Sequence, residues 1–197
     1  MPGHTAWVGL NIIGKLQSGE EMYLSAASGA VGLVTGQLGK IKGCRVVGSA
    51  GSDEKVKRLK EVYNYDEAFN YRDERDWVAA LRRYLPHGFD VYYENVGGRM
   101  LEAALETIRT KGRIVACGMV SQYNKKPHER GGVRNLMNVV GKSLRMEGFL
   151  EFEYQETWDT FLEEVSEYVL EGKIKYETDV LGQGVEEFPK ALAALLK

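Results

Sequence analysis

Residues 25–36 read SAASGAVGLVTG and directly follow the apolar run 22–24 (MYL). This stretch has no charge and little side-chain bulk. Its two glycines within four residues disfavour a helix interior, because each costs roughly 1 kcal/mol relative to alanine. They favour a turn that brings the backbone close to another group. The sequence therefore predicts a strand at 22–26, a tight turn, and a helix at 28–38.

Strand-like and helix-like segments alternate along the rest of the chain. Short apolar or aromatic runs predict strands at 44–48, 68–70, 90–96, 112–118 and 143–150. Helices are predicted at 53–62, 74–84, 99–107, 157–170 and 186–196. Strands joined by helices predict right-handed crossovers and a doubly wound parallel sheet, an α/β Rossmann fold. We expect residues 22–197 to form a dinucleotide-binding domain and residues 1–21 to be an N-terminal helix that packs on another domain.

Composition narrows the classes of function. Of the 197 residues, 44% are hydrophobic and 27% are charged, which is typical of a globular protein. The formal net charge of -2 argues against nucleic acid or an anionic membrane as the main partner. No apolar run approaches the ~20 residues of a membrane span, and the N-terminus lacks a secretory signal. We therefore expect a cytoplasmic protein.

The residues that bind zinc in proteins are scattered in this chain. The two cysteines, Cys44 and Cys117, are far apart in the sequence. The three histidines are also scattered, at His4, His87 and His128. A zinc site needs thiolates or imidazoles at close spacing. No metal site is expected.

The glycine stretch contains Ala27-x-Gly29-x-x-Gly32, which differs by one alanine from the dinucleotide fingerprint G-x-G-x-x-G. Gly29 would let the backbone approach a pyrophosphate, and Gly32 would let the helix pack closely on the strand. The helix amino end adds unpaired N–H groups and a partial positive charge. A purely structural glycine pair is the alternative, but the alternating strands and helices favour dinucleotide binding.

Small residues end the second predicted strand and bear on the choice of dinucleotide. An NAD site usually places Asp or Glu about 20 residues after the glycines to hold the ribose 2′-hydroxyl. Here 48–52 reads GSAGS, and the first carboxylate is Asp53, the predicted cap of the next helix. Small residues leave room for a 2′-phosphate, which Lys55 can neutralise. NADP(H) is therefore favoured over NAD(H), with a merely solvated Lys55 beside Asp53 as the alternative.

Three further side chains follow predicted strands at the edge where ligands bind in open α/β sheets. Tyr71 stands at the expected adenine edge, and Asn95 can face the nicotinamide ribose. Tyr123 lies in the polar stretch 121–135, a predicted long loop, where a phenol can donate a proton. Ordinary packing for Tyr71, turn capping for Asn95 and a structural role for Tyr123 remain open.

Six runs occur in order across almost the whole chain: SAASGAVG, VVGSAGSDEKV, FNYR, YYENVGG, GRIVACGMVSQYN and LRMEGF. Together they resemble the zinc-free medium-chain dehydrogenases/reductases, among them plant NADPH-dependent 2-alkenal (double bond) reductases and the related prostaglandin reductases. The resemblance implies hydride transfer from NADPH to the β-carbon of an enal or enone, followed by protonation at the α-carbon. An NADP-binding module without turnover and a quinone oxidoreductase are the alternatives.

The resemblance also implies residue roles. The residues that would hold the pyrophosphate are Gly29, Ala30, Val31 and Gly32. Gly51 and Lys55 would meet the 2′-phosphate, Tyr71 the adenine and Asn95 the nicotinamide side. The nicotinamide would be lined by Cys117, Gly118, Met119, Val120, Ser121, Gln122, Tyr123 and Phe149. Tyr123 matches the residue proposed as proton donor and substrate binder.

Relatives carry a separate domain before the MPGHTAW stretch and a closing strand after the last helix, and these form half of the active-site cleft. We therefore expect the chain by itself to bind NADPH and to turn over enals feebly. A small-molecule enal or enone is the expected substrate. Relatives also imply a homodimer formed at the sheet edge near the sixth strand.

Overall fold

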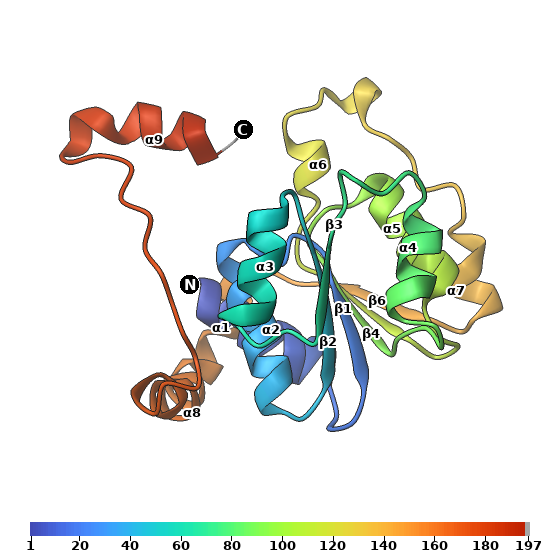
Figure 1. Ribbon diagram of the computed structural model, residues 1–197, viewed down its shortest axis with the longest axis horizontal. Helices are drawn as coiled ribbons and strands as arrows, with labels where there is room; N and C mark the ends of the chain where they lie inside the picture. The colour runs from blue at the N-terminus through green and yellow to red at the C-terminus, as the bar shows by residue number, and fades with distance from the viewer. Residues whose placement is uncertain (196–197) are drawn as a thin grey trace.

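The computed structural model describes residues 1–195. Its centre is a six-stranded sheet in the order β3-β2-β1-β4-β5-β6 (Figure 1). The strands are β1 Glu21–Leu24, β2 Arg45–Ala50, β3 Glu67–Asn70, β4 Val91–Glu94, β5 Arg113–Ala116 and β6 Arg145–Gly148. All neighbouring pairs are parallel. The predicted doubly wound parallel sheet is confirmed.

Helices cover both faces of this sheet (Figure 1). The helices of the described chain are α1 Pro2–Val8, α2 Ala30–Ile41, α3 Asp53–Glu61, α4 Trp77–Tyr84, α5 Gly98–Thr107, α6 Val120–Tyr123, α7 Met137–Gly141, α8 Trp158–Leu170 and α9 Phe188–Leu195. Of these, α9 lies away from the sheet, at the end of a long extended segment (Figure 1). Because successive strand side chains point to opposite faces, Met22 and Leu24 join the core under α1, α2 and α8. Tyr23 joins the core under α4 and α5.

Two local predictions were wrong. Asp53 does not cap α3: Ser52 takes this place with extended backbone, and its Oγ accepts a hydrogen bond from the Lys55 N–H. Asp53 is instead the first helical residue, where its charge favours the positive end of the helix. The stretch 121–135 is also not all loop, because α6 reaches Tyr123 and a 3-10 turn forms at Pro127–Glu129.

Apolar side chains of the N-terminal segment pack in the core beside the sheet. Ala6, Val8 and Leu10 are fully buried in the core that contains β1. The hydroxyl of Tyr93 on β4 donates a hydrogen bond of 2.9 Å to the Thr5 carbonyl oxygen. Residues of this segment therefore share a core with β1. The division of the chain at residue 22 and the packing of residues 1–21 on another domain stay predictions.

Polar contacts tie the same segment to the start of α8. The ring of the buried His4 hydrogen-bonds to Glu151 at 2.6 Å and to Thr157 at 2.9 Å. The indole N–H of Trp7 donates to Glu164 at 2.8 Å. These bonds join α1 to α8 and to the residues that precede it.

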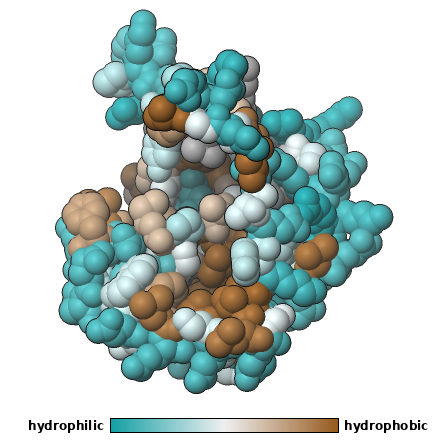
Figure 2. All heavy atoms as spheres, turned by 90° about the vertical axis from the view of Figure 1, so that its left-hand side faces the viewer, coloured by the Kyte–Doolittle hydropathy of each residue, from teal (hydrophilic) through white to brown (hydrophobic). Residues whose placement is uncertain are grey.

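The face that carries α8 and α9 exposes large apolar side chains around a hollow (Figure 2). They include Leu162, Leu170, Val180, Leu181, Phe188 and Leu192. Exposed apolar surface of this kind is typical of a protein contact. In the described part of the chain, no helix has the length and apolarity that a membrane crossing needs.

Candidate cofactor-binding site

The strand order reverses between β1 and β4, so the helices that follow these strands leave toward opposite faces. Such a point opens a crevice beyond the carboxyl ends of the strands, where open α/β sheets bind ligands. The predicted site residues come from segments that follow all six strands. Sequence-distant candidates such as Gly29, Asn95 and Phe149 thus share one edge of the sheet.

The glycine turn after β1 has two glycines with different tasks. A Cβ on Gly32 would lie 2.6 Å from the carbonyl oxygens of Ala26 and Ala27, so only glycine allows α2 to start this close to β1. A Cβ on Gly29 would lie 3.3 Å from the Ala26 oxygen, which is tight but tolerable. Gly29 is exposed and is the N-cap of α2 without a side-chain cap. The first N–H groups of α2, from Ala30 onward, are therefore free of intrahelical partners and suit an anion.

Lys55 in the first turn of α3 faces the same region. It lines a cavity of about 690 Å³ together with Gly29, Ala30 and Arg58. The neighbouring carboxylate of Asp53 is engaged elsewhere, because it accepts a hydrogen bond of 3.1 Å from the Asn70 side chain. Glu177 and Asp179 line the same cavity, and the Arg58 guanidinium pairs with the Glu177 carboxylate. The lining thus places Lys55 near the free end of α2, whereas the charge of Arg58 is already balanced.

Tyr71 stands beside Gly51 at the end of β3. Its hydroxyl lies 3.1 Å from the position of a Cβ on Gly51, so a larger residue there would crowd the phenol. The Trp77 ring meets Tyr71 edge-on, with centroids 6.2 Å apart, and the Trp77 N–H donates to the Tyr71 carbonyl oxygen. These contacts hold the phenol at the adenine end of the predicted site.

A second cavity, of about 470 Å³, lies beyond β5 and β6. Five of the predicted nicotinamide residues line it: Cys117, Gly118, Met119, Tyr123 and Phe149. Burial raises the pKa of the Cys117 thiol, so this group remains a neutral wall residue rather than a nucleophile.

Tyr123 folds back over this cavity. Its side chain is 60% exposed, and its hydroxyl accepts a hydrogen bond of 3.0 Å from the Met119 N–H. The phenolic oxygen lies 2.7 Å from the position of a Cβ on Gly118, so the glycine makes room for it. The hydrogen bond thus places the Tyr123 hydroxyl beside the cavity, where it can donate a hydrogen bond or a proton.

The structure does not bring all predicted nicotinamide residues together. Ser121 and Gln122 border a different cavity beside Gly97 and Gly98. Asn95 donates its side-chain amide hydrogen to the Ser25 carbonyl oxygen at 2.9 Å, which leaves the amide oxygen as the atom available to a ligand. This bond ties the end of β4 to the segment after β1. The turn-capping and ligand-facing roles of Asn95 both stay predictions.

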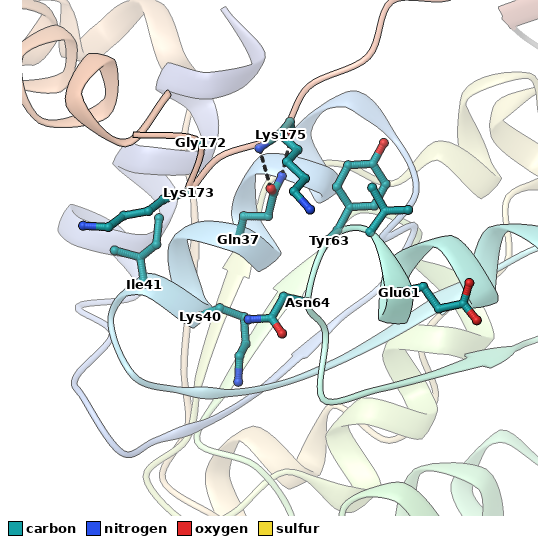
Figure 3. Close-up of a pocket in the computed structure, with 10 residues that line it drawn as sticks. Gln37, Lys40, Ile41, Glu61, Tyr63, Asn64, Gly172, Lys173 and Lys175 are labelled. Carbon is teal, nitrogen blue, oxygen red and sulfur yellow. Dashed lines mark hydrogen bonds between the residues drawn. The ribbon is translucent and has the colours of Figure 1, made fainter. Parts of the chain in front are cut away.

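A third cavity lies away from the carboxyl edge, between α2, the end of α3 and the segment after α8 (Figure 3). Gln37 exchanges two hydrogen bonds with the backbone of Lys175, at 2.8 and 3.0 Å. None of the predicted site residues lines this cavity. The Gln37 bonds fasten the segment after α8 to α2, and this cavity is separate from the candidate cofactor site.

Comparison with known proteins decides the family. The sequence profile described as zinc-binding dehydrogenase matches residues 30–167. The chain belongs to this family. It is 50% identical over 195 residues to the 2-alkenal reductase (NADP(+)-dependent) of Nicotiana tabacum. It is 47% identical over 192 residues to the (+)-pulegone reductase of Mentha piperita. The predicted resemblance to alkenal reductases is confirmed.

The alignments cover 99% and 98% of this chain but 56% and 55% of the two relatives. Among solved structures, CurA from Vibrio vulnificus in complex with NADPH is similar, with a TM-score of 0.91 and 37% sequence identity. That superposition covers 100% of this chain and 59% of CurA. The chain therefore spans a little more than half the length of the relatives it matches.

Because the family is described as zinc-binding, we looked for residues that could bind zinc in this chain. Among residues 1–195, no group of three or more His, Cys, Asp or Glu could hold a metal ion. Burial also raises the pKa of both thiols, Cys44 and Cys117, which opposes the thiolate form that zinc requires. The zinc-free reading stays a prediction.

Sequence reasoning missed two side chains at this edge of the family fold. Arg58 was taken only as part of a helix, although it lines the cavity with Lys55. Glu94 ends β4 and is completely buried. The signal for Glu94 was a carboxylate inside the aromatic run DVYYENV, since a buried charge needs dedicated partners.

Proposed function

We propose that this chain is the cofactor-binding part of an NADPH-dependent reductase that acts on the α,β carbon–carbon double bond of enals and enones. The observation that carries the proposal is the meeting of the glycine turn, the Lys55 cavity and the Tyr123 cavity along one sheet edge. The names of the relatives and the NADPH complex of CurA support it.

The residues present fit this cofactor. The close approach at Gly32 positions the amino end of α2 for the pyrophosphate, and Lys55 supplies positive charge for the 2′-phosphate. When bound, NADPH supplies the hydride that is added to the β-carbon. The segment from Cys117 to Met119 and the side chain of Phe149, which line one cavity, would border and orient the nicotinamide.

Tyr123 has two roles in the proposed reaction. Its O–H stabilises the negative charge that develops on the carbonyl oxygen of the substrate, and it is the acid that supplies the proton for the α-carbon. The balance is one hydride and one proton added across the double bond, with NADPH oxidised to NADP⁺. The protein supplies binding and orientation, and the cofactor the redox chemistry.

We also propose a cytoplasmic homodimer. The composition supports the location. Within residues 1–195, β6 pairs with β5 alone, so its other edge has no strand partner there, and unpaired edges favour pairing with a second copy. Sedimentation equilibrium tests the dimer.

Lys55→Ala is expected to weaken NADPH binding by about 1–3 kcal/mol, the range of a charge-assisted hydrogen bond. NADH affinity should remain unchanged, because NADH lacks the 2′-phosphate. Cofactor fluorescence titration measures both constants. Lys57→Ala is the matched control, since Lys57 lies on the same helix, pairs only with Glu61 at 3.9 Å and does not line the cavity. Equal affinities for the two cofactors in the parent chain would refute the NADP(H) assignment.

The reductase assignment itself is tested by turnover. A chimaera in which this chain replaces its aligned segment of the tobacco relative should oxidise NADPH in the presence of a short 2-alkenal. The chain by itself should bind NADPH with little turnover, because a half-formed cleft does not orient the alkene. An inactive but folded, NADPH-binding chimaera would support the cofactor-binding module without turnover. Reduction of quinones but not of enals would support the quinone oxidoreductase.

A further inference from the structure

Glu94 is a completely buried carboxylate at the carboxyl end of β4. Its Oε1 accepts hydrogen bonds from the N–H groups of Val96 and Gly97, the latter at 2.9 Å. The Ser25 hydroxyl donates a third, longer bond of 3.3 Å. Its Oε2 has no hydrogen-bond partner. The carboxylate therefore closes the turn 94–98 from the inside.

This carboxylate is costly to the fold. Burial raises the pKa of Glu94, and the N–H groups of Gly97 and Val96 oppose the shift. A buried charge with an unpartnered oxygen is usually less stable than an apolar side chain of similar volume. Stability alone thus gives no reason for glutamate at this position. Its hydrogen bonds to the backbone instead fix the conformation of the turn.

The turn adopts an unusual backbone. Gly97 and Gly98 both have positive φ, 74° and 56°, which glycine adopts without steric cost. A Cβ on Gly97 would lie 3.0 Å from the Met119 side chain. The Glu94 carboxylate satisfies the N–H groups of Val96 and Gly97, and the two glycines let the segment after β5 pack closely on the turn.

The outer side of the turn holds that segment through backbone bonds. The Glu94 carbonyl oxygen accepts from Cys117 and Gly118 at 3.0 and 3.1 Å. The Asn95 oxygen accepts from the Val120 N–H at 2.9 Å. The Val96 oxygen accepts from Ser121, both from its N–H at 3.1 Å and from its hydroxyl at 2.6 Å. One turn thus fixes most of the wall on which the nicotinamide is proposed to lie.

We propose that Glu94 is a positioning residue for the nicotinamide half of the cofactor site. The inference rests on the proposed NADPH-binding function. The carboxylate holds the turn 94–98, and the turn holds residues 117–121 in the position that shapes the Tyr123 cavity. Glu94 itself touches neither substrate nor cofactor.

The adenine half does not depend on this carboxylate. Gly51 and Lys55 follow β2, which is separated from β4 by β1. Ser25 links Glu94 to the glycine turn, but its Oγ also accepts from the Tyr92 hydroxyl at 3.0 Å and from the Asn95 N–H at 3.1 Å. Loss of the Glu94 side chain therefore leaves the start of the glycine turn anchored.

The test compares two ligands, NADPH and adenosine 2′,5′-bisphosphate, which carries only the adenine half. Glu94→Ala should raise the dissociation constant of NADPH about tenfold, the effect of losing charge-assisted hydrogen bonds in the wall. The constant for the bisphosphate should stay within about twofold. Glu94→Gln keeps an oxygen for the two N–H groups and should recover most of the NADPH affinity.

Tyr23→Phe is the control for a general loss of stability. It removes a buried hydroxyl that bonds to Ser49 at 2.9 Å, outside the turn, and should leave both constants unchanged. If Glu94→Ala does not fold, Glu94→Gln carries the comparison, with a smaller rise for NADPH alone. Equal weakening of both ligands, or no change for either, would overturn the inference. A parent chain that binds neither ligand would instead overturn the proposed function.

Discussion

Phenylalanine in place of Tyr123 should slow enal-dependent NADPH oxidation by the chimaera about 10²–10⁴-fold, the usual contribution of a general acid. The variant lacks both the proton and the donor that stabilises the developing oxyanion. The aromatic ring remains, so the wall beside Gly118 is preserved. NADPH affinity should therefore change little, and the loss should lie in kcat rather than in the cofactor binding constant.

Single-turnover oxidation of bound NADPH by a short 2-alkenal measures this loss without interference from product release. Tyr168→Phe is the control. That hydroxyl lies on α8, bonds to Glu164 at 3.3 Å and lines neither the Lys55 cavity nor the Tyr123 cavity. A Tyr123→Phe variant with the parent rate would assign the proton to water or another donor. A variant with normal rate but weak NADPH binding would make Tyr123 a cofactor contact only.

The strands and their order along the chain were predictable, because most are short runs of apolar or aromatic residues between turn residues. β6 (RMEG) is more polar, and it was predicted as part of the longer run 143–150. The site edge followed from the same pattern, since parallel strands place all their carboxyl ends together. The glycine turn was the strongest local signal. The backbone contact at Gly32 explains why: no side chain fits between α2 and the carbonyl oxygens of Ala26 and Ala27.

Packing of the N-terminal segment was not predictable from its own residues. Its apolar face indicated a helix that needs a partner, but the partner is set by distant residues, including Tyr93 on β4 and Glu164 on α8. Glu94 was missed for a similar reason. Its burial depends on the path of the turn 94–98, and single-sequence patterns do not describe that path.

The predicted nicotinamide residues after β5 line two different cavities, and the cause is local. Met119 to Tyr123 form a short helical turn, and neighbouring residues on a helix point in different directions. Tyr123 therefore faces the cavity with Phe149, whereas Gln122 faces Gly98. The residues predicted to form one continuous binding loop therefore line two different cavities, because α6 turns their side chains in different directions.

Gly36→Ala should destabilise the chain by about 3–5 kcal/mol, far more than a surface substitution. A Cβ at this position of α2 would lie 2.0 Å from the ring carbon and the hydroxyl oxygen of Tyr65. Tyr65 is buried, and its hydroxyl donates a hydrogen bond of 2.8 Å to the Gly32 carbonyl oxygen. The added methyl must displace either the ring or the helix, and both movements break this bond at the amino end of α2.

Urea denaturation followed by circular dichroism gives the loss in free energy of unfolding. Gly141→Ala is the matched control, because nothing lies within 4 Å of its Cβ position and its helix is exposed; its effect should not exceed about 1 kcal/mol. Because the clash has one defined partner, Gly36→Ala and Tyr65→Ala should be strongly non-additive. The double variant should be more stable than the sum of the single losses predicts, by about 2 kcal/mol or more. Simple additivity would mean that α2 and Tyr65 are not in contact, and the close packing that places the glycine turn at the cofactor site would have to be abandoned.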